Sequence, residues 1–351
     1  MISEPVSERL RLAQKLLSVK QNIAKEISNE FFVNHPEWID RYGDRGREFC
    51  TADACFNIEF LAGAFEAGSP DAFADYLSWT TRMLSARGIA AHSLEENLSH
   101  LEKHLLAVLL PDEHKTIAAF LALGRKVWKE PESVPEEPTE EGLDLTRKMF
   151  LSAILGGHRR AALGIVEEAL RDGHSHVDVY VDVFTEALHR VGELWELNKI
   201  SVAQEHMATS ITQYAIANIY RRLVPDATSR GSMIVTGVSG ELHQIGANLV
   251  ADAMEAKGWA VHFLGSNVPH SAVLLAVEED AADVLCISTT IVANLPSVTA
   301  LVQSLRSELG ERAPKIILGG GAHRLATQFA SDIGVQEALV DLKTALAVLC
   351  A

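Results

Sequence analysis

The stretch GSMIVTGVSGELHQIGANLV, residues 231–250, joins an apolar run, a glycine-flanked polar turn and a segment with helical spacing. A short run rich in β-branched residues favours a strand, and apolar residues three and four apart favour a helix. Similar β-rich runs then alternate with helical patterns to the end of the chain. The five runs are residues 233–238, 260–264, 284–288, 315–318 and 337–340. This alternation predicts a Rossmann-like (flavodoxin-like) domain of five parallel strands over residues 229–351.

Two helical regions precede this domain, which makes the fold class mixed α and α/β. Apolar residues recur at helical spacing through the first 125 residues, so residues 1–128 are expected to form an all-helical sensory, output or dimerisation domain. The acidic, proline-rich sequence KEPESVPEEPTEEG at 129–142 cannot build a core and predicts a linker. Helical periodicity returns over residues 143–228, where two glycine breaks give the spacing of a four-helix bundle.

The composition excludes several classes of function. The chain has 31 Lys and Arg against 47 Asp and Glu, a net charge of -16, which argues against direct DNA binding. No signal sequence or membrane-length apolar run is evident, so a cytoplasmic location without membrane association is expected. The four cysteines show no CxxC pair, which argues against a cysteine zinc site. Because no catalytic triad or pair of catalytic carboxylates stands out, the chain is not expected to be an enzyme on its own.

The loops after the strands carry the polar residues of interest. In a parallel sheet, ligands bind where the carboxyl ends of the strands meet helix N-termini. The first loop lacks both the dinucleotide-binding glycine pattern and the P-loop lysine. It places Glu241 two residues before His243, so a carboxylate can orient the imidazole as it does for a metal-bound histidine. From spacing alone, a histidine on a surface turn is the simpler alternative.

Taken together, these loops resemble the cobalamin-binding domain in its base-off, His-on form. The family pattern is Asp-x-His-x-x-Gly after the first strand; here Glu241 takes the place of the aspartate and Gly246 is the motif glycine. The resemblance implies that His243 is the lower axial cobalt ligand and displaces the nucleotide tail of cobalamin. The residues that it assigns to the slot for this tail are Ser288, Thr290, Gly319, Gly320 and Gly321.

The helical region before the sheet carries a second motif. Trp195 is followed ten and eleven residues later by Glu205 and His206. Spacing alone favours a core tryptophan and a surface pair on a helix. The pattern W-x9-E-H, however, resembles the helical cap of the adenosylcobalamin photoreceptors, light-responsive repressors of carotenoid genes. That resemblance implies that Trp195 packs against the upper adenosyl group, that His206 ligates cobalt after photolysis, and that Glu205 is a neighbouring polar contact.

The resemblance therefore predicts a cobalamin-binding signalling protein and light sensor, in which adenosylcobalamin photolysis changes cap position, oligomeric state or partner binding. The expected partner is a protein such as a transcription regulator, and a homo-oligomer is left open. Residues 1–125 depart from the family because they lack its winged-helix domain. The alternative is a corrinoid carrier subunit of a methyltransferase system, with methylcobalamin as the cofactor and an upper face open to the partner. A cobalamin-sequestering or redox-sensing protein is a third class.

A group of aromatic residues and four further histidine and arginine positions are expected to have structural roles. The aromatic residues between 56 and 79 have the spacing of a helical core. His100 and His104 lie one helical turn apart, a spacing that can ligate metal, but their segment is interpreted as a solvated amphipathic face. His323 and Arg324 follow the triple glycine and are interpreted as surface residues, with contact to the nucleotide phosphate of the ligand as the alternative.

Overall fold

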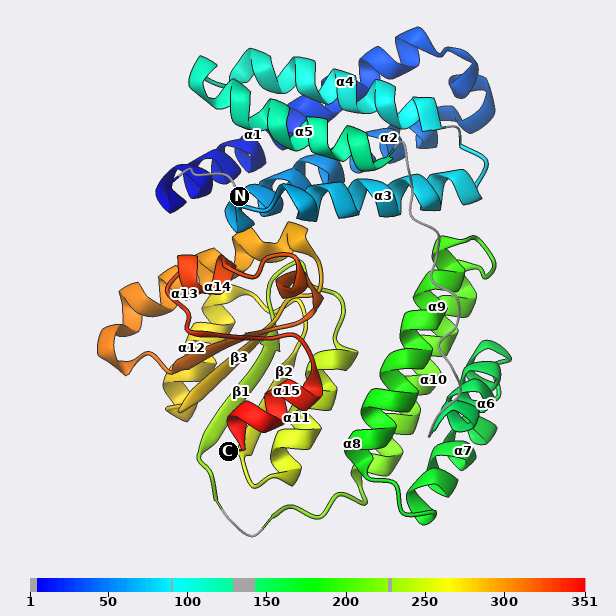
Figure 1. Cartoon of the computed structure of the whole chain (residues 1–351), viewed down its shortest axis with the longest axis vertical. Helices are drawn as coiled ribbons and strands as arrows, with labels where there is room; N and C mark the ends of the chain where they lie inside the picture. The colour runs from blue at the N-terminus through cyan, green and yellow to red at the C-terminus, as the bar shows by residue number, and fades with distance from the viewer. Residues whose placement is uncertain (1–4, 90, 129–142, 227–228, 351) are drawn as a thin grey trace. The chain divides into compact units, whose positions relative to one another are not determined.

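The computed structural model describes residues 5–89, 91–128, 143–226 and 229–350 (Figure 1). It divides into two compact units. The first contains the N-terminal helices together with residues 289–303 and 322–336, and the second contains the bundle from residue 143 together with the rest of the sheet domain. The predicted linker at 129–142 lies outside the described residues.

The first unit is built from five long helices, as the periodicity predicted. They are α1 (Val6–Asn34), α2 (Glu37–Ala67), α3 (Pro70–Ala86), α4 (Ala91–Val108) and α5 (His114–Trp128). Gly68, at a left-handed φ of 60°, ends α2, and the Ser69 side chain accepts a hydrogen bond from Ala72 N to cap α3. The predicted aromatic core is present in part: the rings of Phe60 and Tyr76 stack with centroids 3.8 Å apart, whereas Phe56 is 50% exposed and does not belong to the core.

Within this unit, α1 and α2 also contact the segments that follow β3 and β4. A Cβ added at Gly63 of α2 would lie 2.0 Å from the Val292 carbonyl oxygen, so glycine permits a very close approach. The buried Arg9 pairs with Asp332 at 2.7 Å. Glu66, which is 2% exposed, accepts a hydrogen bond of 2.6 Å from the Thr299 hydroxyl. The short elements here are η3 (Val292–Asn294), η5 (Gly321–Arg324), α14 (Phe329–Asp332) and the start of α13 (Leu295–Leu309).

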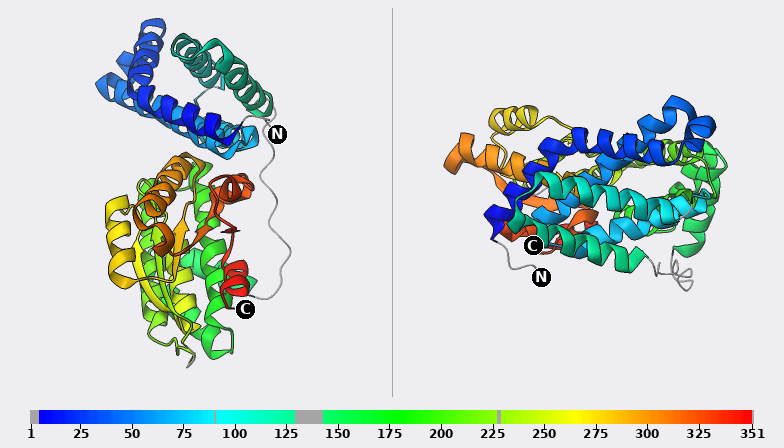
Figure 2. Two further views of the ribbon diagram at one scale, coloured as in Figure 1. Left: turned by 90° about the vertical axis from the view of Figure 1, so that its left-hand side faces the viewer. Right: turned by 90° about the horizontal axis from the view of Figure 1, so that it is seen from above.

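The second unit contains the five-stranded parallel sheet, in the order β2-β1-β3-β4-β5. Its strands are β1 (Ser232–Gly237), β2 (Ala260–Gly265), β3 (Val284–Ser288), β4 (Lys315–Gly319) and β5 (Glu337–Leu339). All five predicted strands are confirmed. Two helices, α11 (Ile245–Ala256) and α15 (Leu342–Leu349), pack on one face, and α12 (His270–Asp280) lies on the other (Figure 2). The Rossmann-like prediction is therefore correct.

The bundle that precedes the sheet is helical, as predicted, with one unforeseen feature. Its helices are α6 (Asp144–Leu155), α7 (Arg159–Arg171), α8 (His176–Asp178), α9 (Glu186–Glu196) and α10 (Val202–Tyr220), and the π-helix η2 (Val179–Thr185) joins α8 to α9. Its apolar core continues into Leu249 and Ala253 of α11 and Leu342 of α15. The Tyr180 hydroxyl donates to Asp252 at 3.2 Å within this contact. The bundle is thus packed directly on the sheet domain.

Candidate functional site

The loop between β1 and α11 holds the predicted acid and histidine in direct contact. Gly240, at φ 89°, donates its N–H to the Asn267 side chain at 2.8 Å, which ties this loop to the next. The Glu241 side chain is fully buried. One of its oxygens, Oε1, accepts the backbone N–H of His243 at 2.9 Å and faces Nδ1 of the same residue at 2.6 Å. The predicted orientation of the imidazole by a carboxylate is confirmed.

This contact determines the chemistry of His243. Its side chain is 60% exposed, and Nε2 has no hydrogen-bond partner among the described residues. The hydrogen bond to Glu241 raises the pKa of His243, against the opposing effect of burial, and the negative charges of Glu241 and Glu205 raise it further. Because the carboxylate holds the proton at Nδ1, the neutral ring presents an Nε2 lone pair, the arrangement of a metal-bound histidine.

The bundle supplies a second acid and imidazole pair. Ser201 caps α10 and accepts a hydrogen bond from Gln204 N at 3.3 Å. Glu205 and His206 follow in the first turns, where Nδ1 of His206 contacts the Glu205 carboxylate and the imidazole is 75% exposed. Since the charge of Glu205 acts on His243, the start of α10 faces the loop after β1. Trp195 lies half-buried in the last turn of α9.

The loops after β3 and β4 lie side by side, and the nucleotide slot assigned to them stays a prediction. Ser288 and Gly319 pair in the sheet register, and Ala322 N donates to the Thr289 carbonyl at 3.3 Å. Gly320 has φ 103°, a conformation that favours glycine. The remaining predicted residues here, Thr290 and Gly321, are half-buried.

Gly246, the motif glycine, lies in open space, because an added Cβ would meet nothing within 4 Å. No neighbouring atom of the described residues therefore requires a glycine at position 246. A bulky ligand that approaches the backbone closely would require one.

The interpretation of His323 as a surface residue is wrong. Its side chain is 2% exposed and stacks on Phe329 at 6.0 Å between ring centroids, whereas Arg324 is exposed as expected. Burial lowers the pKa of His323 to about 4, so the ring is neutral. Neither of its ring nitrogens, nor the buried Thr289 hydroxyl, has a hydrogen-bond partner within the described part of the chain. The sequence analysis considered His323, but no periodicity or motif spacing marks either position as buried.

His100 and His104 are not on a solvated face, because each side chain is only 15% exposed. They lie between α4 and α1 and pair with Glu30 at 2.6 Å and Glu26 at 3.0 Å. Over the residues that the structure describes, no group of three or more His, Cys, Asp or Glu side chains could hold a metal ion. These histidines therefore contribute to helix packing in the first unit.

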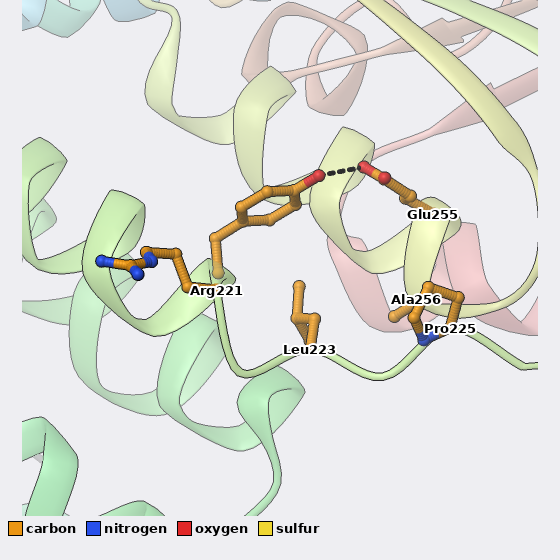
Figure 3. Close-up of a pocket in the computed structure, with 6 residues that line it drawn as sticks. Arg221, Leu223, Pro225, Glu255 and Ala256 are labelled. Atoms are coloured by element: carbon orange, nitrogen blue, oxygen red, sulfur yellow. Dashed lines mark hydrogen bonds between the residues drawn. The ribbon is translucent and has the colours of Figure 1, made fainter.

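A small pocket of about 170 Å³ lies outside the predicted site (Figure 3). Its lining comes from the end of α10, the segment after it and the end of α11: Tyr220, Arg221, Leu223, Pro225, Glu255 and Ala256. The Tyr220 hydroxyl donates to Glu255 at 2.7 Å across the pocket. His206 lies on the first turns of the same 19-residue helix, roughly 20 Å away at 1.5 Å per residue. The pocket and the candidate site are separate features.

Comparisons with known proteins agree with this geometry. Residues 146–220 and 231–343 each match a family described as B12 binding domain. Dimethylamine corrinoid protein 1 of Methanosarcina acetivorans is 28% identical over 148 residues, which cover 41% of this chain and 68% of the relative. A corrinoid protein of Desulfitobacterium hafniense is 20% identical over 186 residues, covering 52% and 85%. The monomethylamine corrinoid protein of Methanosarcina barkeri shares the fold, with a TM-score of 0.54, 19% identity and coverage of 60% of this chain and 99% of that one.

Across the described helices, none is long and apolar enough to cross a membrane. The relatives named here are described as corrinoid proteins and none is described as a photoreceptor, so they support the carrier alternative over the light sensor. The photoreceptor resemblance remains a prediction. The cobalamin-binding prediction is supported by both family matches, which together extend from the helical bundle through the sheet domain. The chain therefore carries B12-binding domains over residues 146–220 and 231–343.

Proposed function

We propose that this chain is the corrinoid carrier of a methyl-transfer system, which exchanges methyl groups with separate methyltransferase partners. The observation that carries the proposal is the Glu241 and His243 pair, which presents an unpaired Nε2 at the carboxyl end of β1. The corrinoid relatives support the same reading, and two are named for dimethylamine or monomethylamine. A methylated amine is accordingly the substrate class that we assign to the system.

The residues present fit a corrinoid. An oriented imidazole is available as the lower ligand, and Gly246 leaves open space beside it. When bound, the corrinoid supplies a cobalt centre that accepts and releases a methyl group. His243 would hold this centre through Nε2, because Glu241 retains the proton on Nδ1.

The bundle serves as the cover of the site. The start of α10 faces the His243 loop, and Val202 there is 52% exposed, so apolar surface is available for a macrocycle. Covering the site excludes water, while the methyltransferase requires access to the upper face of the corrinoid. We assign no catalytic group to this chain, because methyl donation and acceptance belong to the partners.

The test uses the full chain loaded with cobalamin in the dark. The absorption spectrum should show that a histidine replaces the nucleotide base in wild type, and His243→Ala should lose this signature. Reduction followed by methyl iodide should then methylate the bound corrinoid without releasing it. Release on reduction, or failure to accept the methyl group, would refute the carrier function.

A light-sensing signalling protein is the second candidate, favoured by Trp195 and by the exposed His206 beside Glu205. In this case the cofactor is adenosylcobalamin, and the partner is a regulatory protein or a second copy of the chain. Green light should convert the adenosylcobalamin-loaded chain to a stable new spectrum that His206→Ala cannot form. Ordinary aquocobalamin as the product in both proteins would exclude this candidate.

A further inference from the structure

One side of α2 carries exposed aromatic rings on both sides of an acid. Phe49 and Phe56 are 59% and 50% exposed, and apolar side chains exposed together are more informative than a single one, because they mark interaction sites. Asp53 lies four residues after the first ring and three before the second, and residues at these spacings are neighbours on the surface of a helix. Phe60, four residues beyond Phe56, continues the stripe.

Helix α3 extends this aromatic surface. Tyr76 stacks on Phe60 with ring centroids 3.8 Å apart, and Trp79 stacks on Tyr76 with centroids 6.3 Å apart. The charge of Asp53 acts on the Tyr76 phenol, so α3 faces the acid as well as the rings. Both helices belong to the first unit. We call Asp53 and five rings the aromatic patch, the rings being Phe49, Phe56, Phe60, Tyr76 and Trp79.

The Asp53 carboxylate has no hydrogen bond or ion pair within the described part of the chain. Burial alone raises its pKa to about 6, and no basic group offsets this effect. The side chain is nevertheless exposed to solvent. It is therefore surrounded by protein on some sides and open on another. Because an unpaired carboxylate that is partly removed from water is unfavourable, a cation that enters from outside would stabilise it.

The chemistry of the aromatic patch selects the kind of cation. A metal ion needs several ligands, and no group of His, Cys, Asp or Glu side chains among the described residues could hold one. A methylated ammonium ion needs one negative charge and aromatic faces, because its methyl groups contact the rings and its charge is attracted to their π electrons. A cation already contacts this surface, since the Arg45 guanidinium lies 5.7 Å from the centroid of the Phe49 ring.

We propose that the aromatic patch binds a small methylated ammonium ion, with Asp53 as its counter-ion and with Phe49 and Phe56 in contact with its methyl groups. The site lies outside both B12-binding matches and gives the N-terminal helices a sensory role. Recognition of the cation follows from the patch alone. Its identification with the substrate of the same methyl-transfer system rests on the proposed function.

Proton NMR of tetramethylammonium tests its binding to the full chain. Ring currents of the aromatic patch should shift the methyl resonance upfield as protein is added, and the titration gives the dissociation constant. Tert-butanol, a neutral molecule of similar size, should bind at least tenfold more weakly, because it has no charge to pair with Asp53.

The dependence of the affinity on pH is a second measurement. Lowering the pH from 8 to 5 should weaken binding of tetramethylammonium, because Asp53 then becomes protonated. The electrostatic neighbours of Asp53 are Cys50 on the same helix and Tyr76 on α3. Both stay neutral over this range, because burial raises the pKa of each.

Variants separate recognition of the cation from packing. Asp53→Asn keeps the shape of the side chain and should reduce the affinity about tenfold and remove its dependence on pH. Because burial disfavours the charge of Asp53, this variant should fold at least as well as wild type. Phe56→Leu should reduce the affinity about threefold and give a smaller upfield shift. Glu48→Gln is the matched control, because Glu48 is an exposed acid on another face of α2.

The outcomes distinguish this inference from the proposed function. An unshifted methyl resonance, equal affinities for tetramethylammonium and tert-butanol, or equal affinities of wild type and Asp53→Asn overturns the inference. A wild-type dimer that Phe56→Leu converts to a monomer, without an upfield shift in wild type, assigns the patch to a second copy of the chain and also overturns it. Absorption titration of cobalamin in the same preparation tests the proposed function: failure to bind cobalamin refutes the corrinoid carrier and leaves cation recognition standing.

Discussion

Replacing Glu241 by glutamine tests the lower half of the cobalt site. One carboxylate oxygen receives both the backbone N–H and Nδ1 of His243, and the side chain is fully buried. Glutamine has the same shape and keeps an acceptor oxygen, so the substitution removes the charge and leaves the geometry available. The expected loss in the free energy of cobalamin binding equals the difference in strength between a hydrogen bond to a charged group and a hydrogen bond to a neutral group.

That difference is about 1 to 1.5 kcal/mol, which corresponds to roughly tenfold in affinity. Mutation of residues that orient metal ligands costs 10- to 100-fold, so tenfold lies at the lower end of the range. Glu241→Leu removes the acceptor altogether and should approach 100-fold. Because the Glu241 contact raises the pKa of His243, Glu241→Gln should also lower that pKa, and proton competition should then begin at a lower pH than in wild type.

Absorption titration of cobalamin at pH 8 measures the loss of affinity in the two proteins directly. Below the pKa of His243 in wild type, the difference in cobalamin affinity between the two proteins should become smaller. Protonation of His243 weakens ligand binding by wild type more than by Glu241→Gln, because the pKa of His243 is higher in wild type. Glu308→Gln is the control, since Glu308 is an exposed acid on α13. Unchanged affinity of a folded Glu241→Gln protein at pH 8 would refute the idea that this carboxylate sustains cobalt ligation.

Three further predictions concern the framework of the two units. Burial raises the pKa of Glu66 to about 7, so the folded state retains a proton that the unfolded state loses above pH 4.5. The free energy of unfolding should therefore fall by about 3 kcal/mol as the pH rises from 4.5 to 7. Urea unfolding of Glu66→Gln should show a smaller dependence of this free energy on pH. Tyr180→Phe removes the hydroxyl that donates to Asp252, and burial raises the pKa of Asp252 to about 6. We expect urea unfolding to show a loss of about 1 to 2 kcal/mol in the free energy of unfolding, and NMR to show a further rise in the pKa of Asp252. Ser201→Ala removes the cap of α10 and should cost about 1 kcal/mol in thermal unfolding, whereas an unchanged midpoint would show that the cap contributes nothing.

The strands of the sheet and the two acid and imidazole pairs could be predicted, because the sequence patterns that indicate them involve residues close together in the chain. Each strand is a short β-rich run bounded by turns, and the contact of Glu241 with His243 follows from a separation of two residues in a turn. The cap pair, Glu205 and His206, is equally local. For these features, neighbours in sequence are neighbours in space, and the pattern alone carries the geometry.

The features that could not be predicted depend on packing between distant segments. His323 is buried because Phe329, from the following short helix, covers it, and no periodicity marks a loop residue as enclosed. Val292, after β3, receives the close approach of Gly63 from α2, a contact more than 200 residues apart in sequence. The π-helix at Val179–Thr185 was likewise not predicted, because its β-branched and aromatic sequence VYVDVFT carries no signal for a wider helical turn.

The two acid and imidazole pairs differ in a way that bears on function. Glu241 is fully buried, so its charge acts on His243 with little screening by water, whereas Glu205 is 30% exposed and His206 is 75% exposed. The loop pair is therefore built to hold one fixed orientation, and the cap pair can be displaced at small cost. A carrier needs this asymmetry, because its lower ligand must persist through each cycle while its upper face opens to a partner. In the light-sensor candidate, the exposed imidazole of His206 would be available as a further ligand for a bound cobalamin, so His206→Ala is the variant that separates the two candidate functions.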